Sequence, residues 1–185
     1  MLKTILTILI AIGSISFGFA QGTIAPDLKQ TQVRITILPL GLSLEQKLGE
    51  KQTLALAGGL QLGAYAYTSS NNGSGTEFYA APFFAGEIRN YYNRKFVKKE
   101  LEQNSGNYVA LAFGYSGNRL GDAENVIFEN SYENSFFVGP VWGFQRNYKT
   151  GFHLNLSIGL GYQDGEYLDG GVKIISTGGI GFFLR

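Results

Sequence analysis

The sequence of 185 residues has no cysteine, one histidine and one tryptophan. Without cysteine there is no disulfide scaffold, no thiolate metal site and no cysteine nucleophile. One histidine among scattered carboxylates does not provide the clustered ligands that a metal site needs. We therefore expect no metal and no cofactor.

Charge is also scarce. Charged residues make up 16% of the chain, and 15 Lys and Arg nearly balance 14 Asp and Glu. This balance excludes a basic nucleic-acid-binding module and an acidic disordered tail. After residue 20 no run approaches the ~18 consecutive apolar residues that indicate a membrane helix. Glycine, by contrast, is abundant at 26 residues, about twice its usual share.

The first twenty residues have the layout of a secretory signal peptide. Lys3 precedes an apolar run over Thr4–Ile12, and the small residues Gly18 and Ala20 stand before Gln21. We predict that residues 1–20 are a cleaved signal and that residues 21–185 form the mature domain. An uncleaved membrane anchor is the alternative, and the small residues at the end favour cleavage.

Beyond the signal, apolar residues alternate with small or polar ones, as expected for strands with two different faces. In Phe152–Gln163 every even position is apolar and every odd position is polar or glycine. Five further segments repeat this split: Thr53–Thr68, Glu77–Tyr92, Asn107–Ser116, Ser135–Tyr148 and Val172–Arg185. The pattern predicts an all-β chain.

The direction of the apolar face decides the class of protein. A soluble lipocalin-like barrel would turn it inward around a lipid, whereas a membrane barrel turns it outward. The opposite face is rich in Gly and Ala, which favours a crowded lumen. Aromatic residues near segment ends are typical of interfacial belts: Tyr65, Tyr67, Phe78, Tyr91, Tyr92, Tyr115, Tyr148, Phe152, Tyr162, Phe182 and Phe183. We expect a transmembrane barrel.

The number of strands depends on Thr31–Leu48. Its apolar residues change from odd to even positions across Pro39-Leu40-Gly41. A turn there gives two short strands and a total of eight, whereas a bulge leaves seven. Even numbers are the rule in bacterial outer-membrane barrels, so we predict a single antiparallel up-and-down barrel of eight strands. Longer loops are expected at Ser69–Thr76, Gly117–Asn134 and Asp164–Gly171, and a capping segment at Asn93–Gly106.

Four stretches carry a family resemblance: Glu87–Asn93 (EIRNYYN), Ser105–Leu111 (SGNYVAL), Gly139–Tyr148 (GPVWGFQRNY) and Phe152–Tyr162 (FHLNLSIGLGY). With them the chain resembles small eight-stranded bacterial outer-membrane β-barrels of the OmpA/OmpX type, and most closely a poorly characterised group of them. The resemblance implies insertion by the barrel-insertion machinery and contact with outer-membrane lipid. Such barrels often end in Phe, whereas this chain ends Phe182-Phe183-Leu184-Arg185.

An eight-stranded barrel has an interior that side chains can just fill, and buried charges there must be paired. The inward face offers a polar network that we expect to plug the lumen: Arg34, Glu45, Lys47, Glu87, Arg89, His153 and Asn155. Gln61, Gln145, Asn147 and Lys173 are further lumen candidates. A narrow path for ions or small solutes is the alternative to a plug.

Two remaining patterns bear on function. His153, Asn155 and Ser157 share a face and superficially suit a His/Ser pair, but that face is predicted to line the lumen, so we expect no enzyme. The outer loops carry acidic residues that could bind divalent cations or an envelope partner, although solvation of loop tips explains them as well: Asp122, Glu124, Glu129, Glu133, Asp164, Glu166 and Asp169. We therefore expect a non-enzymatic outer-membrane barrel with a structural or interaction role through its loops; the alternatives are a narrow channel and a soluble lipocalin-like lipid carrier.

Overall fold

The structure is a computed structural model that describes residues 28–69, 73–93, 101–120, 134–166 and 168–184. The predicted signal peptide, residues 1–20, lies outside these ranges. So do Asp122, Glu124, Glu129 and Glu133 of the predicted acidic loop. Within the described ranges there is no helix, and so none that is long and apolar enough to cross a membrane.

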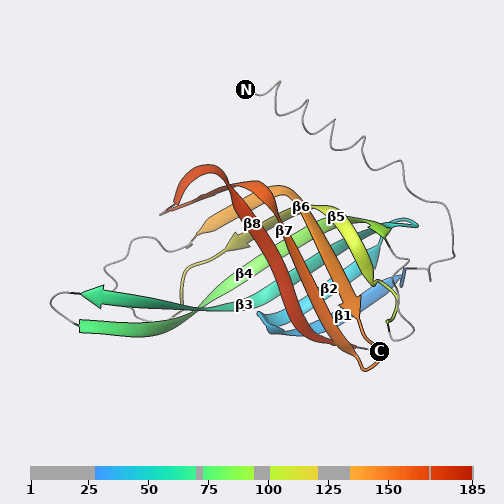
Figure 1. Ribbon diagram of the computed structural model, residues 1–185, viewed down its shortest axis with the longest axis horizontal. Helices are drawn as coiled ribbons and strands as arrows, with labels where there is room; N and C mark the ends of the chain where they lie inside the picture. Colours follow the sequence, from blue (N-terminus) through green and yellow to red (C-terminus); the bar gives the residue numbers. More distant parts are fainter. Residues whose placement is uncertain (1–27, 70–72, 94–100, 121–133, 167, 185) are drawn as a thin grey trace, which may run out of the picture.

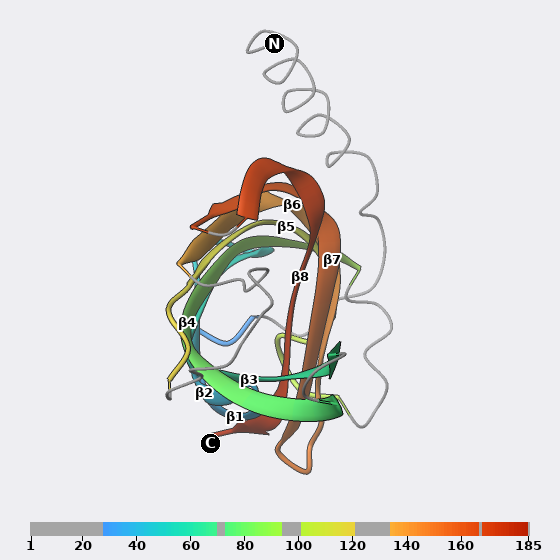
Figure 2. The same cartoon turned by 90° about the vertical axis from the view of Figure 1, so that its left-hand side faces the viewer.

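Eight strands form one sheet: β1 (Thr31–Leu38), β2 (Leu40–Lys47), β3 (Gln52–Ser69), β4 (Gly73–Asn93), β5 (Gly106–Ser116), β6 (Ser135–Asn147), β7 (Phe152–Gly165) and β8 (Leu168–Phe183). Each strand pairs antiparallel with the next, and β8 pairs with β1, so the sheet closes into a barrel (Figures 1 and 2). The predicted all-β fold with eight antiparallel up-and-down strands is confirmed.

The change of phase near Pro39 is a turn and not a bulge. Thr36 pairs with Gly41 across the β1–β2 hairpin, and the Leu38–Pro39 peptide bond in its turn is cis. Both strands have eight residues, and every other strand is longer. The interpretation that gives eight strands is therefore confirmed.

Two predicted loops are shorter than expected, because the strands on either side extend into them. β3 extends to Ser69 and β4 begins at Gly73, while Gly165 of β7 pairs with Leu168 of β8. Strand preference depends on context, and here continued backbone pairing outweighs the turn tendency of Gly, Asn and Asp. As a result Asp164 lies in β7 and Asp169 in β8, and of these three acidic residues Glu166 alone stands between the two strands.

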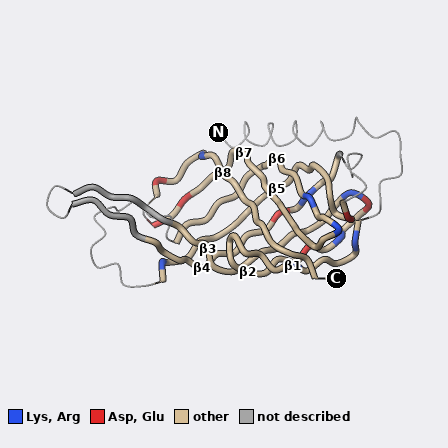
Figure 3. The backbone as a smooth tube through the Cα atoms, turned by 60° about the horizontal axis from the view of Figure 1, so that its bottom comes forward, with Lys and Arg blue, Asp and Glu red and all other residues tan. Residues whose placement is uncertain are grey.

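The two ends of the barrel differ. One end, which we call the terminal end, holds the start of β1 and the end of β8, where Leu184 N–H donates to Val33 O and Phe183 N–H to Gly151 O. The opposite end, which we call the loop end, carries the β3–β4 hairpin, which projects beyond the other strands in Figure 1. Figure 3 shows charged residues near both ends and few between them.

The apolar rows face outward and the polar rows face inward. Leu156 and Ile158 of β7 are 49% and 53% exposed, whereas Asn155 and Ser157 between them are 9% and 1% exposed. The other strands repeat this arrangement, with exposed Val, Leu, Ile and aromatic residues and a buried polar set. This is the inverse of a lipocalin-like barrel, in which the apolar rows would line the centre.

The short β1–β2 hairpin leaves part of the wall unpaired. β3 pairs with β2 only as far as Leu60, and β8 pairs with β1 only from Ile180. Beyond these points none of the strands that the structure describes pairs on this side with residues 61–69 of β3 or with residues 168–179 of β8. We call this interval the notch. The hairpin tip at Leu38 and Pro39 forms its edge toward the terminal end.

Glycine is required where β2 and β3 approach each other. A Cβ on Gly59 would overlap the carbonyl of Leu40 and the backbone of Gly41. We expect Gly59→Ala to lower the free energy of unfolding by about 1–3 kcal/mol, the usual cost of overpacking. Urea unfolding followed by circular dichroism measures it. Gly171→Ala is the matched control, because nothing lies within 4 Å of a Cβ at Gly171; equal midpoints for the two variants would contradict the prediction.

Candidate functional site

Glu45 of β2 is the centre of a hydrogen-bonded network inside the barrel. Its side chain is fully buried and forms an ion pair with Arg34 of β1. It also accepts hydrogen bonds from Thr53 Oγ1 at 2.8 Å, Tyr91 Oη at 2.9 Å and Gln145 Nε2 at 2.8 Å. Strands β1, β2, β3, β4 and β6 thus meet at one carboxylate, which ties opposite walls of the barrel together.

A second buried carboxylate, Glu87, is held by three neighbours. Arg89 Nε donates to it at 2.6 Å and Ser157 Oγ at 2.8 Å, and Thr177 also donates to it. Glu87 and Arg89 are two residues apart on β4, so both point into the lumen. The Glu87 group therefore connects β4 with β7 and β8.

Arg89 links the two carboxylates. Its Nη1 donates to Gln145 Oε1 at 2.6 Å and lies 3.8 Å from Glu45 Oε2. Its guanidinium carbon lies 4.6 Å from the ring centroid of Tyr108, within the range of a cation–π contact. Two arginines face two glutamates, so the charges balance. Paired and hydrogen-bonded charges are the form in which ions are tolerated in a protein interior.

The terminal end of the lumen is closed by polar side chains and by the segment before β5. Asn147 Nδ2 donates to Gln32 Oε1 at 2.9 Å, and Asn147 Oδ1 lies 2.7 Å from His153 Nδ1. Asn104 and Ser105 are buried over this group, where Asn104 O accepts from Gln145 at 2.7 Å. The described part of the predicted capping segment thus packs against the network.

Of the predicted lumen residues, the structure brings six together: Arg34, Glu45, Glu87, Arg89, His153 and Asn155 are all buried. Lys47 lies half-buried near the end of β2, where its backbone N–H donates to Gln30. Of the acidic set, Asp164 accepts from Tyr162 Oη at 3.0 Å and Glu166 accepts from Asn134 Nδ2 at 2.6 Å. Asp169 is exposed on β8.

Two tyrosines of the network were missed by sequence reasoning. Tyr91 was assigned to an outer aromatic belt, but it is buried and bonded to Glu45. Tyr108 is also buried, with its hydroxyl 2.7 Å from the Asn155 amide. The signal for Tyr91 was its odd position, in phase with Glu87 and Arg89; the same reasoning places Gln32 with Arg34.

Ser157 and His153, which share a face of β7, bond to different partners. Ser157 is hydrogen-bonded to Glu87 and Thr177, while His153 is bonded to Asn147. The structure therefore does not assemble the His/Ser pair that the sequence pattern suggested. Among the described residues no group of three or more His, Asp or Glu side chains is placed to hold a metal ion.

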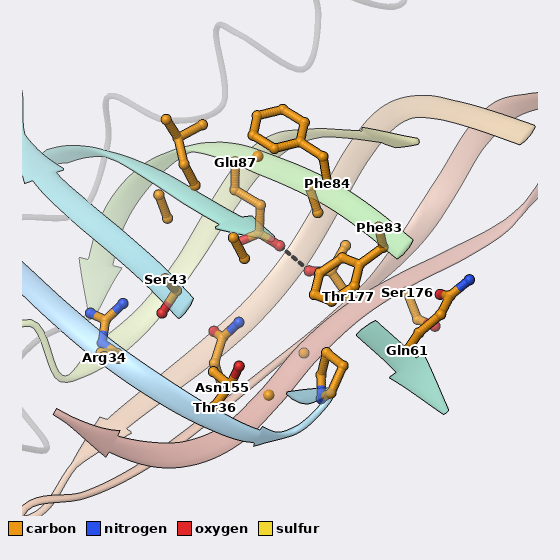
Figure 4. Close-up of a pocket in the computed structure, with 18 of the residues that line it drawn as sticks. Arg34, Thr36, Ser43, Gln61, Phe83, Phe84, Glu87, Asn155, Ser176 and Thr177 are labelled. Carbon is orange, nitrogen blue, oxygen red and sulfur yellow. Dashed lines mark hydrogen bonds between the residues drawn. The ribbon is translucent and has the colours of Figure 1, made fainter. Parts of the chain in front are cut away.

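A cavity of about 480 Å³ lies beside the network, toward the loop end (Figure 4). Arg34, Glu87 and Asn155 border it on the network side, and small residues make room for it: Ala55, Ala57, Ala85 and Gly179. Its remaining boundary includes the hairpin tip and both edges of the notch: Leu38, Pro39, Gln61, Leu62, Ser176 and Gly178. The cavity thus reaches the notch.

The fold and the site define a small closed β-barrel with an apolar exterior, buried polar side chains at its terminal end and a side cavity. Comparisons of the chain with protein-family models, with curated proteins and with solved structures found no match. The function of this chain must therefore be inferred from its geometry.

Proposed function

We propose that this chain is a bacterial outer-membrane β-barrel, exported by a cleaved signal peptide, with a plugged lumen and a non-enzymatic role at its loop end. The observation that carries the proposal is the inverted arrangement of faces. Large apolar side chains are exposed on all eight strands or their ends, while ion pairs are buried in the centre. In water such a surface would be a severe aggregation hazard, whereas hydrocarbon is its natural solvent.

Two aromatic belts support insertion. Near the terminal end the belt contains Tyr92, Phe144, Tyr148, Phe152 and Phe182, with Tyr148, Phe152 and Phe182 in ring contact. Near the loop end it contains Phe84, Phe113, Tyr115, Phe136 and Tyr162. Of the strand side chains that the structure describes, the outward rows between the belts carry one charge, Arg146 of β6, which pairs with Leu154 close to the terminal-end belt. Aromatic belts around an apolar band are typical of membrane barrels.

The spacing of the belts matches a bilayer. Phe152 and Tyr162 are ten residues apart on β7, which corresponds to about 33 Å along the strand. At the ~40° tilt usual for barrels this becomes about 25 Å across the membrane, the height of the apolar band in outer-membrane barrels. The terminal end would then face the periplasm and the loop end the outside.

The buried network supports a plug over a channel. Its arginines and glutamates are engaged with one another, and the capping residues Asn104 and Ser105 cover the terminal end. An ion crossing the lumen would have to break these charge-assisted contacts. With the lumen plugged, the surface left for interaction outside the cell is the loop end. It carries Asp164, Glu166 and Asp169, where an envelope partner could bind.

The experiment is membrane fractionation combined with conductance. We expect the full chain, expressed in a bacterium, to stay in the outer-membrane pellet after alkaline carbonate and to give no single-channel steps in planar bilayers. Release by carbonate would refute insertion and favour a soluble carrier. Regular conductance steps from carbonate-resistant protein would refute the plug and favour a narrow channel.

A further inference from the structure

We infer that the side cavity binds a single-chain lipid, with its polar head at Arg34 and Ser43 and its alkyl chain leaving through the notch into the membrane. A fatty acid is the simplest molecule of this class. The inference rests on the proposed membrane insertion, because the notch must open toward hydrocarbon for the chain to continue there.

The network side of the cavity has unused hydrogen-bonding groups. Arg34 is 1% exposed, and its Nη2 contacts Gln32 and Glu45 while its Nε has no partner in the described part of the chain. The buried Ser43 Oγ also lacks one there. Both residues border the cavity. Leaving a buried polar group unpaired is costly, so an oxygen acceptor that reached this end of the cavity would satisfy both groups.

The middle of the cavity is apolar and the right size for an alkyl chain. Ala55, Ala57, Ala85, Phe83 and Phe137 border it between the network and the notch. Its volume of about 480 Å³ is within the ~300–1,000 Å³ of small-molecule sites. Figure 4 shows Arg34 and Ser43 at one end of the cavity and Gln61 and Ser176 at the other.

The rim of the notch is apolar on three sides. Leu38 and Leu40 stand exposed at the hairpin tip and Leu62 on β3. On β8, Val172 and Ile174 are 75% and 70% exposed. Ile174 pairs with Leu160, and Val172 with Tyr162 of the loop-end belt. The notch therefore opens at the depth of the apolar band, just inside that belt.

The chemical type of the lipid head group can be inferred from the charges around the site. Arg34 and Arg89 are already balanced by Glu45 and Glu87, so the site has no place for a cationic head. The N–H and the hydroxyl that have no partner among the described residues suit an uncharged oxygen acceptor, that of a protonated carboxyl or of an ester, because the balanced network leaves no counter-charge for a carboxylate. A polar floor, an apolar middle and an outer rim of exposed Leu38, Leu62 and Ile174 together select an amphiphile with one chain.

The test uses tryptophan quenching by bromine in phosphatidylcholine vesicles. The native chain has one tryptophan, Trp142, which is exposed on the outward row of β6. Vesicles of dibrominated phosphatidylcholine should quench Trp142, which verifies insertion separately; no quenching there would refute the proposed function itself. The variant Trp142→Phe/Phe83→Trp then moves the probe into the cavity.

In unbrominated vesicles, added dibromostearic acid should quench the tryptophan at position 83 saturably. A further Gly179→Phe exchange should abolish most of this quenching, because a Cβ at Gly179 fits with ordinary contacts to Thr36 and Leu38 and the ring would fill the opening. Ala57→Phe, which fills the cavity from β3, replaces it if Gly179→Phe does not fold. Quenching that stays equal in the filled variant would overturn the inference.

Ser43→Ala tests the head group. Loss of one hydrogen bond should raise the half-quenching concentration about three- to tenfold. Thr150→Ala, at an exposed position in the β6–β7 turn and away from the cavity wall, should leave it unchanged. Equal values for the two alanine variants would overturn the head-group assignment. Absence of saturable quenching in inserted protein would overturn the lipid altogether and favour a peptide strand pairing with β3 or β8.

Discussion

Glu45→Ala is expected to lower the free energy of unfolding by about 3–5 kcal/mol, the range for removing one partner of a buried ion pair. The carboxylate contacts Arg34, Thr53, Tyr91 and Gln145. Its loss leaves Arg34 buried without its counter-charge and removes the contact that joins β2 to β6 across the lumen. Urea unfolding of the protein inserted in phosphatidylcholine vesicles measures the change.

A double variant separates the unpaired charge from the lost packing. Arg34→Ala/Glu45→Ala removes both charges, so it should be more stable than Glu45→Ala alone, with an interaction energy of about 0.5–3 kcal/mol. Glu166→Ala is the control for loss of an acidic side chain, because Glu166 is exposed at the loop end. Strictly additive effects of the two network substitutions would show that Arg34 and Glu45 are not coupled.

Much of the fold follows from local patterns in the sequence. Alternation along Phe152–Gln163 is enough to assign both faces of β7, because successive strand residues point to opposite sides. The phase change at Pro39 is likewise sufficient to separate β1 from β2. By contrast, the starts of β4 and β8 were misjudged by four residues each, since Asp, Asn and Gly favour turns locally and only the partner strand decides otherwise.

The candidate site was only partly predictable. The alternation of apolar and polar residues along each strand identified Arg34, Glu45, Glu87 and Arg89 as inward-facing. It did not show which carboxylate each arginine contacts. That depends on register across several strands, through pairs such as Thr53 with Arg89. The notch could not be predicted from the sequence for the same reason. It arises because β1 and β2 are shorter than β3 and β8, and a sequence without known register does not reveal where a short hairpin stops along its neighbours.

Ile158→Arg is expected to destabilise the inserted protein by about 2–4 kcal/mol, the cost of arginine on the lipid face near the bilayer midplane. Ile158 lies on the outward row of β7 between Phe152 and Tyr162, and it is 53% exposed. Urea unfolding from phosphatidylcholine vesicles measures this cost.

The matched control is Tyr162→Arg, because this residue is on the same row of the same strand but within the loop-end belt. Near the interface the cost of arginine falls to about 0–1 kcal/mol, so the difference between the two variants reports depth in the membrane. If water surrounded the barrel, arginine at Ile158 would be as harmless as at Tyr162. Equal unfolding free energies for the two variants would therefore contradict insertion, whereas the expected difference would place Ile158 in the hydrocarbon and make the apolar exterior of this barrel its membrane-spanning surface.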